Sequence, residues 1–150
     1  MNTVTLTKSD EELLCELHRN LEMCAESTTQ VIGKIDDKEL LSLLTEVVMK
    51  SVELNKRSEK LMHERGITPE KISKMKEIMT DAGIMMNTLF DSSDPHIAEM
   101  MVKGLEMGVV TLRDLTKRLG ETKDSEINAL ANDVAEFEST YAHKIGKFAQ

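Results

Sequence analysis

The stretch SDPHIAEMMVKGLEMGVVTLRDLTKRLG, residues 93–120, decides the fold because it carries every signal of one long amphipathic helix. Ser93 is a good N-cap, and Pro95 suits the first helical turn, where a missing N–H is tolerated. Gly120 marks the end of the segment. Between them, apolar or small residues recur every three or four positions: Ile97, Met101, Gly104, Leu105, Gly108, Leu112, Leu115 and Leu119. The stretch therefore predicts a helix over residues 94–119.

The rest of the chain divides into similar segments, and no alternating strand pattern competes with them. Helix-starting signals stand at Ser9–Glu12, read as a capping box, at Asp36–Asp37, at Thr68–Pro69 and at Asp124 or Ser125. We therefore predict one all-α domain over residues 1–150, with further helices at about 9–33, 37–65, 69–90 and 124–148. Short connections indicate two antiparallel helical hairpins, and helix 69–90 would be the crossover between them.

Composition excludes several classes of function. The formal net charge of -8 argues against binding to nucleic acid or to an anionic membrane, because both require a basic surface. The sequence shows neither a membrane-spanning segment nor a signal peptide. Cys15 and Cys24 would lie on opposite sides of one helix, so they cannot pair with each other. We expect free thiols in a cytoplasmic protein.

The predicted arrangement resembles the ferritin-like four-helix bundle. Asp94-Pro95-His96-Ile97 is similar to a helix opening of ferritins, and Glu59-Lys60-Leu61-Met62 is similar to another ferritin segment. Small bacterial ferritin-like families of unassigned function resemble the chain more closely, through Thr80–Ile84 and Gly104-Leu105-Glu106. The resemblance implies a bundle of two hairpins with a carboxylate-bridged iron or manganese centre.

The residues that such a dimetal centre requires are not found in the sequence. The centre takes a Glu from each of two helices and Glu-x-x-His from the other two, all facing inward. No Glu-x-x-His occurs, and the ligand positions of the ferritin-like segment that ends at Met62 fall on Leu54 and Arg57. We therefore expect no catalytic, cofactor-binding or metal-binding residue and no ferroxidase activity.

Two glutamates are the carboxylate candidates that remain. Glu106 lies about 150° from the inward line of its helix, so we expect it to be solvated. Glu138 lies only about 50° from the inward line of its own helix. We expect it at the boundary of the core, with its carboxylate reaching water. A hydrogen-bonded or metal-binding Glu138 is the alternative.

For the histidines and for two glycines, a structural role is the main interpretation. His63 and His143 should face outward, His96 should lie at the surface, and His18 should lie at the edge of its helix's apolar stripe. Gly104 and Gly108 indicate close packing of a neighbouring helix, or room for a bulky side chain such as Phe137 or Tyr141. A ligand pocket opened by the missing side chains is the sharper alternative.

Eleven methionines are unusual for a chain of this length. They predict a pliable core seam between the helices at 69–90 and 94–119, since Met fills irregular gaps: Met75, Met79, Met86, Met100, Met101 and Met107. An adaptable partner surface is the second interpretation of this seam.

The sequence predicts a non-enzymatic structural or protein-interaction module. The alternative is a protein that binds iron or manganese through an irregular site, with Glu138 and carboxylates from another helix. We also expect a homodimer or a protein partner, because several apolar residues fall outside the predicted core: Met23, Met49, Ile84 and Val110.

Overall fold

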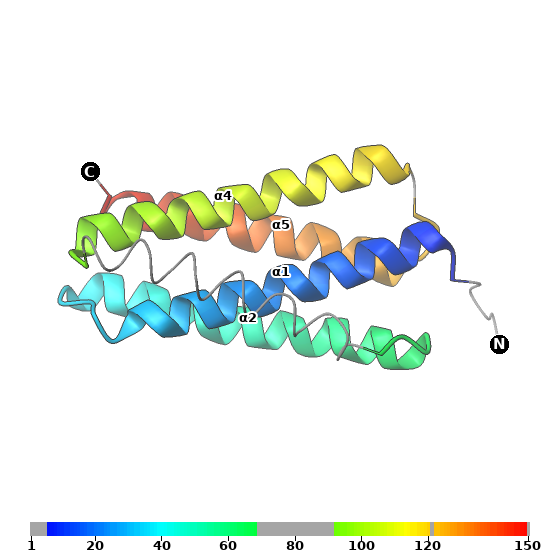
Figure 1. Cartoon of the computed structure of the whole chain (residues 1–150), viewed down its shortest axis with the longest axis horizontal. Coiled ribbons are helices and arrows are strands. Elements are labelled where there is room, and N and C mark those ends of the chain that lie inside the picture. The colour runs from blue at the N-terminus through cyan, green and yellow to red at the C-terminus, as the bar shows by residue number, and fades with distance from the viewer. Residues whose placement is uncertain (1–5, 69–91, 121, 150) are drawn as a thin grey trace.

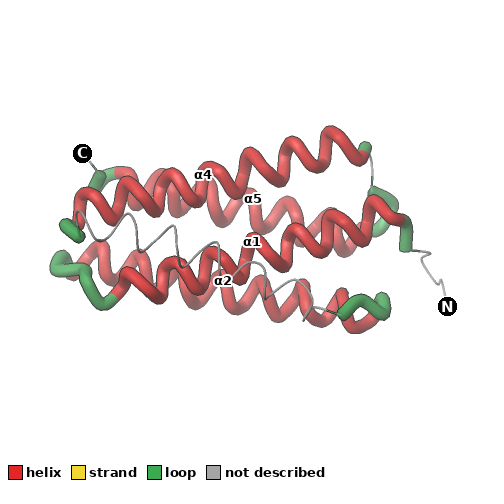
Figure 2. The backbone as a smooth tube through the Cα atoms, in the orientation of Figure 1, coloured by secondary structure: helices red, strands yellow, loops and turns green. Residues whose placement is uncertain are grey.

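The structure is a computed structural model that describes residues 6–68, 92–120 and 122–149. Within these residues the chain forms four α-helices and no strand: α1 (Lys8–Ile32), α2 (Lys38–Glu64), α4 (Asp94–Leu119) and α5 (Ser125–Gly146). Figure 2 shows the four helices side by side as a bundle. The helix expected at 69–90 lies outside the described residues. The all-α bundle that the sequence predicts is therefore confirmed.

Three of the described helices, α1, α2 and α5, begin at side chains that satisfy otherwise unpaired backbone N–H groups. Asp37 accepts hydrogen bonds from Glu39 N and Leu40 N, and Asp124 does the same at the start of α5. The first helix differs from expectation. Its capping box pairs Thr7 with Asp10, not Ser9 with Glu12, because Thr7 Oγ1 accepts from Asp10 N at 3.1 Å.

Two helix pairs make the bundle. The most extensive packing is between α1 and α2, which are joined by residues 33–37, and between α4 and α5, which are joined across residues 120–124. These connections lie at opposite ends of the bundle (Figure 1). Asp94 ties the two pairs together, since its carboxylate accepts from Asp36 N at 3.0 Å and Asp37 N at 2.7 Å. Direct packing of α1 on α4 is less extensive.

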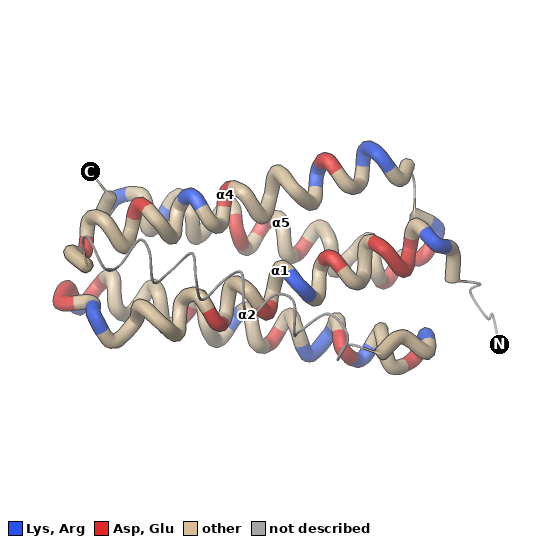
Figure 3. Tube along the Cα trace, in the orientation of Figure 1, with Lys and Arg blue, Asp and Glu red and all other residues tan. Residues whose placement is uncertain are grey.

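The interior contains two apolar clusters, one toward each end of the bundle. One cluster includes Leu40, Leu44, Ile97 and Ile145, and the other includes Leu13, Leu17, Leu112 and Leu130. Between them along α1 and α2 lie small buried polar side chains: Thr28, Ser51 and Ser58. On α5, the buried Glu138 lies next to Phe137 of the first cluster. Acidic and basic residues are distributed along all four helices (Figure 3). The interior of the bundle is thus not uniformly apolar.

An ion pair joins α2 to α5 at the end of the bundle where α5 begins. Arg65 Nε lies 2.7 Å from Asp124 Oδ2, and Arg65 Nη2 lies 3.1 Å from Asp124 Oδ1. The Asp124 side chain is 2 % exposed. Asp10, which is fully buried, accepts a weak hydrogen bond from Asp124 N at 3.5 Å. A bidentate guanidinium therefore neutralises a carboxylate that water barely reaches.

The described helices include none whose length and apolar content would allow it to cross a membrane.

Candidate ligand pocket between α1 and α4

Glu138 is the least expected feature of the interior. Its residue surface is 2 % exposed, and Asn20 Nδ2 on α1 donates a hydrogen bond to its Oε1 at 3.0 Å. The expectation that this carboxylate reaches water is therefore wrong. Glu138 lies near the edge of the apolar stripe of α5, as expected, but Asn20 on α1 and Gly108 on α4 both lie against its carboxyl group.

Gly108 on α4 provides the space for this carboxyl group. A Cβ atom at residue 108 would lie 2.7 Å from Glu138 Oε2, 2.8 Å from its Oε1 and 2.9 Å from Asn20 Nδ2. The glycine therefore does pack closely, but against these two polar side chains, not against the aromatic side chains expected from the sequence. Gly104, one turn earlier, is exposed, and a Cβ there would meet nothing within 4 Å. The expectation of a close helix contact at Gly104 is wrong.

The two glycines should respond oppositely to the same substitution. Gly104→Ala should raise the free energy of unfolding by about 0.5–1 kcal/mol, because alanine is the better helix former and the site is open. Gly108→Ala should show no such gain and should lower stability, since the new methyl group displaces the Glu138 carboxyl from Asn20. Urea denaturation of both variants measures the difference. Equal stabilisation by both substitutions would show that the Glu138 carboxyl does not need the space at residue 108.

Burial sets the protonation of the polar groups in this region. Burial raises the pKa of Glu138 to about 8, and the hydrogen bond from Asn20 opposes part of that rise. At neutral pH the carboxyl group is therefore mostly protonated. Burial also raises the pKa of the Cys24 thiol to about 12. This thiol stays protonated and is a poor nucleophile. A carboxyl group with such a raised pKa beside a cavity is a typical feature of functional sites.

A cavity of about 290 Å³ opens between α1 and α4 above this carboxyl group. We call it the α1–α4 pocket. Its lining is mostly apolar and includes four methionines: Met23, Met100, Met101 and Met107. Polar groups also line it, among them Glu138, Asn20 and the half-buried Glu16. Asn20 Oδ1 is buried and has no hydrogen-bond partner. The pocket therefore combines a soft apolar wall with polar acceptors.

The methionine seam is only partly placed by the structure. Met75, Met79 and Met86 lie outside the described residues, whereas Met100, Met101 and Met107 are among the residues that line the α1–α4 pocket. Met107 is 65 % exposed, so it stands at the pocket's edge and does not form part of a closed core. The expected pliable core seam thus stays a prediction, and on α4 its three methionines line a pocket.

Most other residues singled out from the sequence lie apart from this pocket. Glu106 is exposed, as expected, and so are His63 and His143. Cys15 and Cys24 are both free thiols, and Cys24 is one of the residues that line the α1–α4 pocket. His96 is half-buried. His18 is fully buried, which corrects its expected place at the edge of the stripe.

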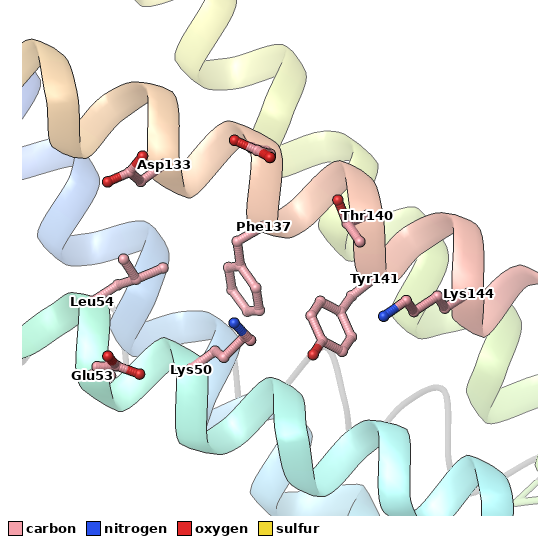
Figure 4. A pocket seen from close by; sticks show the side chains of 9 residues that line it. Lys50, Glu53, Leu54, Asp133, Phe137, Thr140, Tyr141 and Lys144 are labelled. Carbon is pink, nitrogen blue, oxygen red and sulfur yellow. The ribbon is translucent and has the colours of Figure 1, made fainter.

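A second hollow, of about 370 Å³, lies between α2 and α5 (Figure 4). The Phe137 and Tyr141 rings pack there with centroids 5.4 Å apart, and Lys144 Nζ lies 5.0 Å from the Tyr141 centroid. All of its charged lining residues are exposed: Lys50, Glu53, Asp133, Glu136 and Lys144. Mixed, solvated charges of this kind select no particular ligand.

Among the described residues, one group of side chains has the donor atoms and spacing to hold a metal ion: His18, Glu22 and Glu59. Glu138 is not part of it. Sequence reasoning missed the group because its members come from two helices and contain no Glu-x-x-His motif. The four-residue spacing of His18 and Glu22, which places both on one helix face, was the available signal.

Comparisons with protein-family models, with curated proteins and with solved structures find no match to this chain.

Proposed function

We propose that this chain is a non-enzymatic binding protein that holds a small organic amine with an apolar body in the α1–α4 pocket. One observation carries the proposal. The Glu138 carboxyl group occupies the space that Gly108 leaves, beside a mostly apolar cavity whose lining includes four methionines. A glycine in a helix interior and a buried carboxyl group both cost stability, and a binding role accounts for the two together.

The polar groups of the pocket favour an amine over an acid or an alcohol. Glu138 and the unpartnered Asn20 Oδ1 can both accept hydrogen bonds from an ammonium group, which has three donors. An ammonium group beside Glu138 would also supply the opposite charge that stabilises its ionised form. The net charge of -8 favours approach of cations over anions.

The volume of the pocket limits the size of the ligand. Ligand pockets of proteins usually measure about 300–1,000 Å³, and a cavity of about 150 Å³ holds a benzene ring. A pocket of about 290 Å³ thus suits one ring or a short alkyl chain with its head group. Methionine side chains adapt to either shape.

Calorimetric titration with matched compounds tests the proposal. Hexylamine and phenethylamine should bind, whereas hexanol should bind more weakly and hexanoate should not bind. Glu138→Gln should weaken amine binding by about 10-fold or more, because a hydrogen bond to a charged group contributes about 1.5–3 kcal/mol. Hexanol binding should remain. Glu106→Gln, which removes an exposed carboxylate from α4, is the control. Equal binding of the amine, the alcohol and the acid would contradict the proposal, as would amine binding that ignores Glu138→Gln.

We further propose that the bundle is ferritin-like, with α1–α2 and α4–α5 as antiparallel hairpins and residues 69–90 as the crossover. The two short connections at opposite ends support this topology (Figure 1).

A homodimer stays a prediction. It is supported by exposed apolar side chains on α1, α2 and α4: Met23, Leu41, Met49, Val52, Met107 and Val110. Two free thiols support the proposed cytoplasmic location.

A further inference from the structure

A second polar cluster lies where α1 packs on α2, and it shares no residue with the α1–α4 pocket. His18 and Glu22 stand one turn apart on α1, and Glu59 stands on α2. One ligand atom from each of these residues lies within 4.8 Å of the other two. The cluster therefore brings together one imidazole and two carboxylates.

His18 is held so that one ring nitrogen points at this cluster. The residue is fully buried, and its Nδ1 lies 2.9 Å from Asn55 Oδ1. The amide oxygen accepts, so Nδ1 carries the hydrogen and Nε2 keeps its lone pair. Nε2 lies 3.5 Å from Glu22 Oε1 and forms no hydrogen bond. A lone pair facing a carboxylate oxygen at this distance is unfavourable unless a cation lies between them.

Asn55 supports two members of the cluster at once. Its Oδ1 accepts from His18, and its Nδ2 lies 3.5 Å from Glu59 Oε1 at the limit of a hydrogen bond. Ser58 Oγ, at 2.7 Å from Asn55 Oδ1, helps to fix the amide. Metal-binding histidines usually donate their second ring N–H to such an acceptor, which sets the tautomer and the ring orientation.

We propose that His18 Nε2, Glu22 and Glu59 bind one divalent first-row transition metal ion, with water in the remaining positions. Ligand atoms about 2.0–2.2 Å from one ion lie about 3.0–3.5 Å apart. His18 and Glu22 already have that spacing at 3.5 Å, and the exposed Glu59 side chain is free to close on them by rotation. One imidazole with two carboxylates suits Zn²⁺, Fe²⁺ or Mn²⁺ more than Mg²⁺ or Ca²⁺, which prefer oxygen ligands alone.

This site differs from the dimetal centre that the ferritin-like resemblance implies. The proposed site takes one ion, and among the described residues its ligands come from α1 and α2, with none from α4 or α5. An ion bound there would join the two helices of one pair and would stabilise the folded chain by mass action.

Metal titration of the whole chain, stripped with EDTA and dialysed, tests the site. Zn²⁺ and Mn²⁺ should each bind at one ion per chain and raise the melting temperature, whereas Mg²⁺ should not. Co²⁺ should give a visible absorption spectrum that changes when Zn²⁺ displaces it. Glu59→Gln should weaken Zn²⁺ binding by at least about 100-fold, and Asn55→Ala by about 10–100-fold. His63→Gln, which removes an exposed histidine from α2, is the control.

Because His18 is buried, His18→Gln can fail to fold, and Glu59→Gln keeps the test decisive. A proton on His18 Nε2 is the alternative to a metal ion between Nε2 and Glu22. ¹⁵N NMR of the His18 ring distinguishes a bound proton from a bound metal ion. Metal binding should shift Nε2 and leave Nδ1 protonated. A ring protonated on both nitrogens and unchanged by Zn²⁺ would overturn the proposal. So would Zn²⁺ binding that Glu59→Gln and Glu22→Gln leave intact.

Discussion

Glu138→Gln should raise the free energy of unfolding by about 2–4 kcal/mol at pH 8–9 relative to the unchanged chain, and by little near pH 4.5. The pKa of Glu138 is about 8 in the folded chain, against an ordinary value of 4.5. Between these values the folded state holds a proton that the unfolded state has lost. The stability of the unchanged chain therefore falls as the pH rises through this range, and glutamine removes that loss.

Urea denaturation at several pH values between 4.5 and 9 measures this effect as a difference between the two chains. Glu106→Gln serves as the control, because its carboxylate is exposed and should produce no such pH-dependent difference. A stability difference that stays constant with pH would show that Glu138 is ionised in the folded protein. A stability difference between the two chains that grows as the pH falls would show that folding lowers the pKa of Glu138 and does not raise it.

Arg65→Ala should lower the free energy of unfolding by about 3–5 kcal/mol, because it leaves the buried Asp124 carboxylate without its partner. The Asp124 side chain is 2 % exposed and Arg65 is 13 % exposed. Burial alone would raise the pKa of Asp124, but the charge and hydrogen bond of Arg65, together with hydrogen bonds from the backbone N–H groups of Ile127 and Glu126, outweigh burial and hold the pKa below its usual value. The ion pair's contribution is therefore present at neutral pH and is lost as the pH falls through that lowered pKa.

Arg57→Ala is the matched control for Arg65→Ala, since both are arginines of the α2 region that pair with an aspartate of the α5 region. Arg57 Nη1 lies 2.7 Å from Asp133 Oδ2, but these side chains are 44 % and 50 % exposed. Exposed pairs contribute about 0–1 kcal/mol. Similar losses of stability in the two variants, measured by urea denaturation at pH 7, would contradict the role assigned to Asp124 burial.

The helical architecture could be predicted from local signals in the sequence. Caps at Asp37, Ser93 and Asp124, together with apolar residues every three or four positions, suffice to place α2, α4 and α5. The same periodicity places α1, although its cap is Thr7 and not Ser9. The same periodicity correctly predicts an exposed Glu106. These features depend on one helix and its own termini, so no tertiary information is needed for them.

The candidate site could not be predicted because it depends on which neighbours cover each helix. Helix phase gives Glu138 an angle from its own stripe, but not the positions of Asn20 and Gly108 on two other helices. Phase also gives Gly104 and Gly108 similar inward positions, although one faces open space and the other faces a carboxyl group. The burial of His18 likewise depends on α2, which supplies Asn55 and Ser58.

Methyl NMR of the protein labelled at methionine with ¹³C tests the proposed pocket most directly. Phenethylamine should shift the methyl signals of the four pocket methionines, Met23, Met100, Met101 and Met107. It should leave Met62, which is buried in the apolar cluster of Leu13 and Leu130, and the exposed Met49 unchanged. Phenylacetate, with the same ring and the opposite charge, should shift none. Shifts spread over all the methionines, or the same shifts with both compounds, would contradict selective binding of an amine in the α1–α4 pocket.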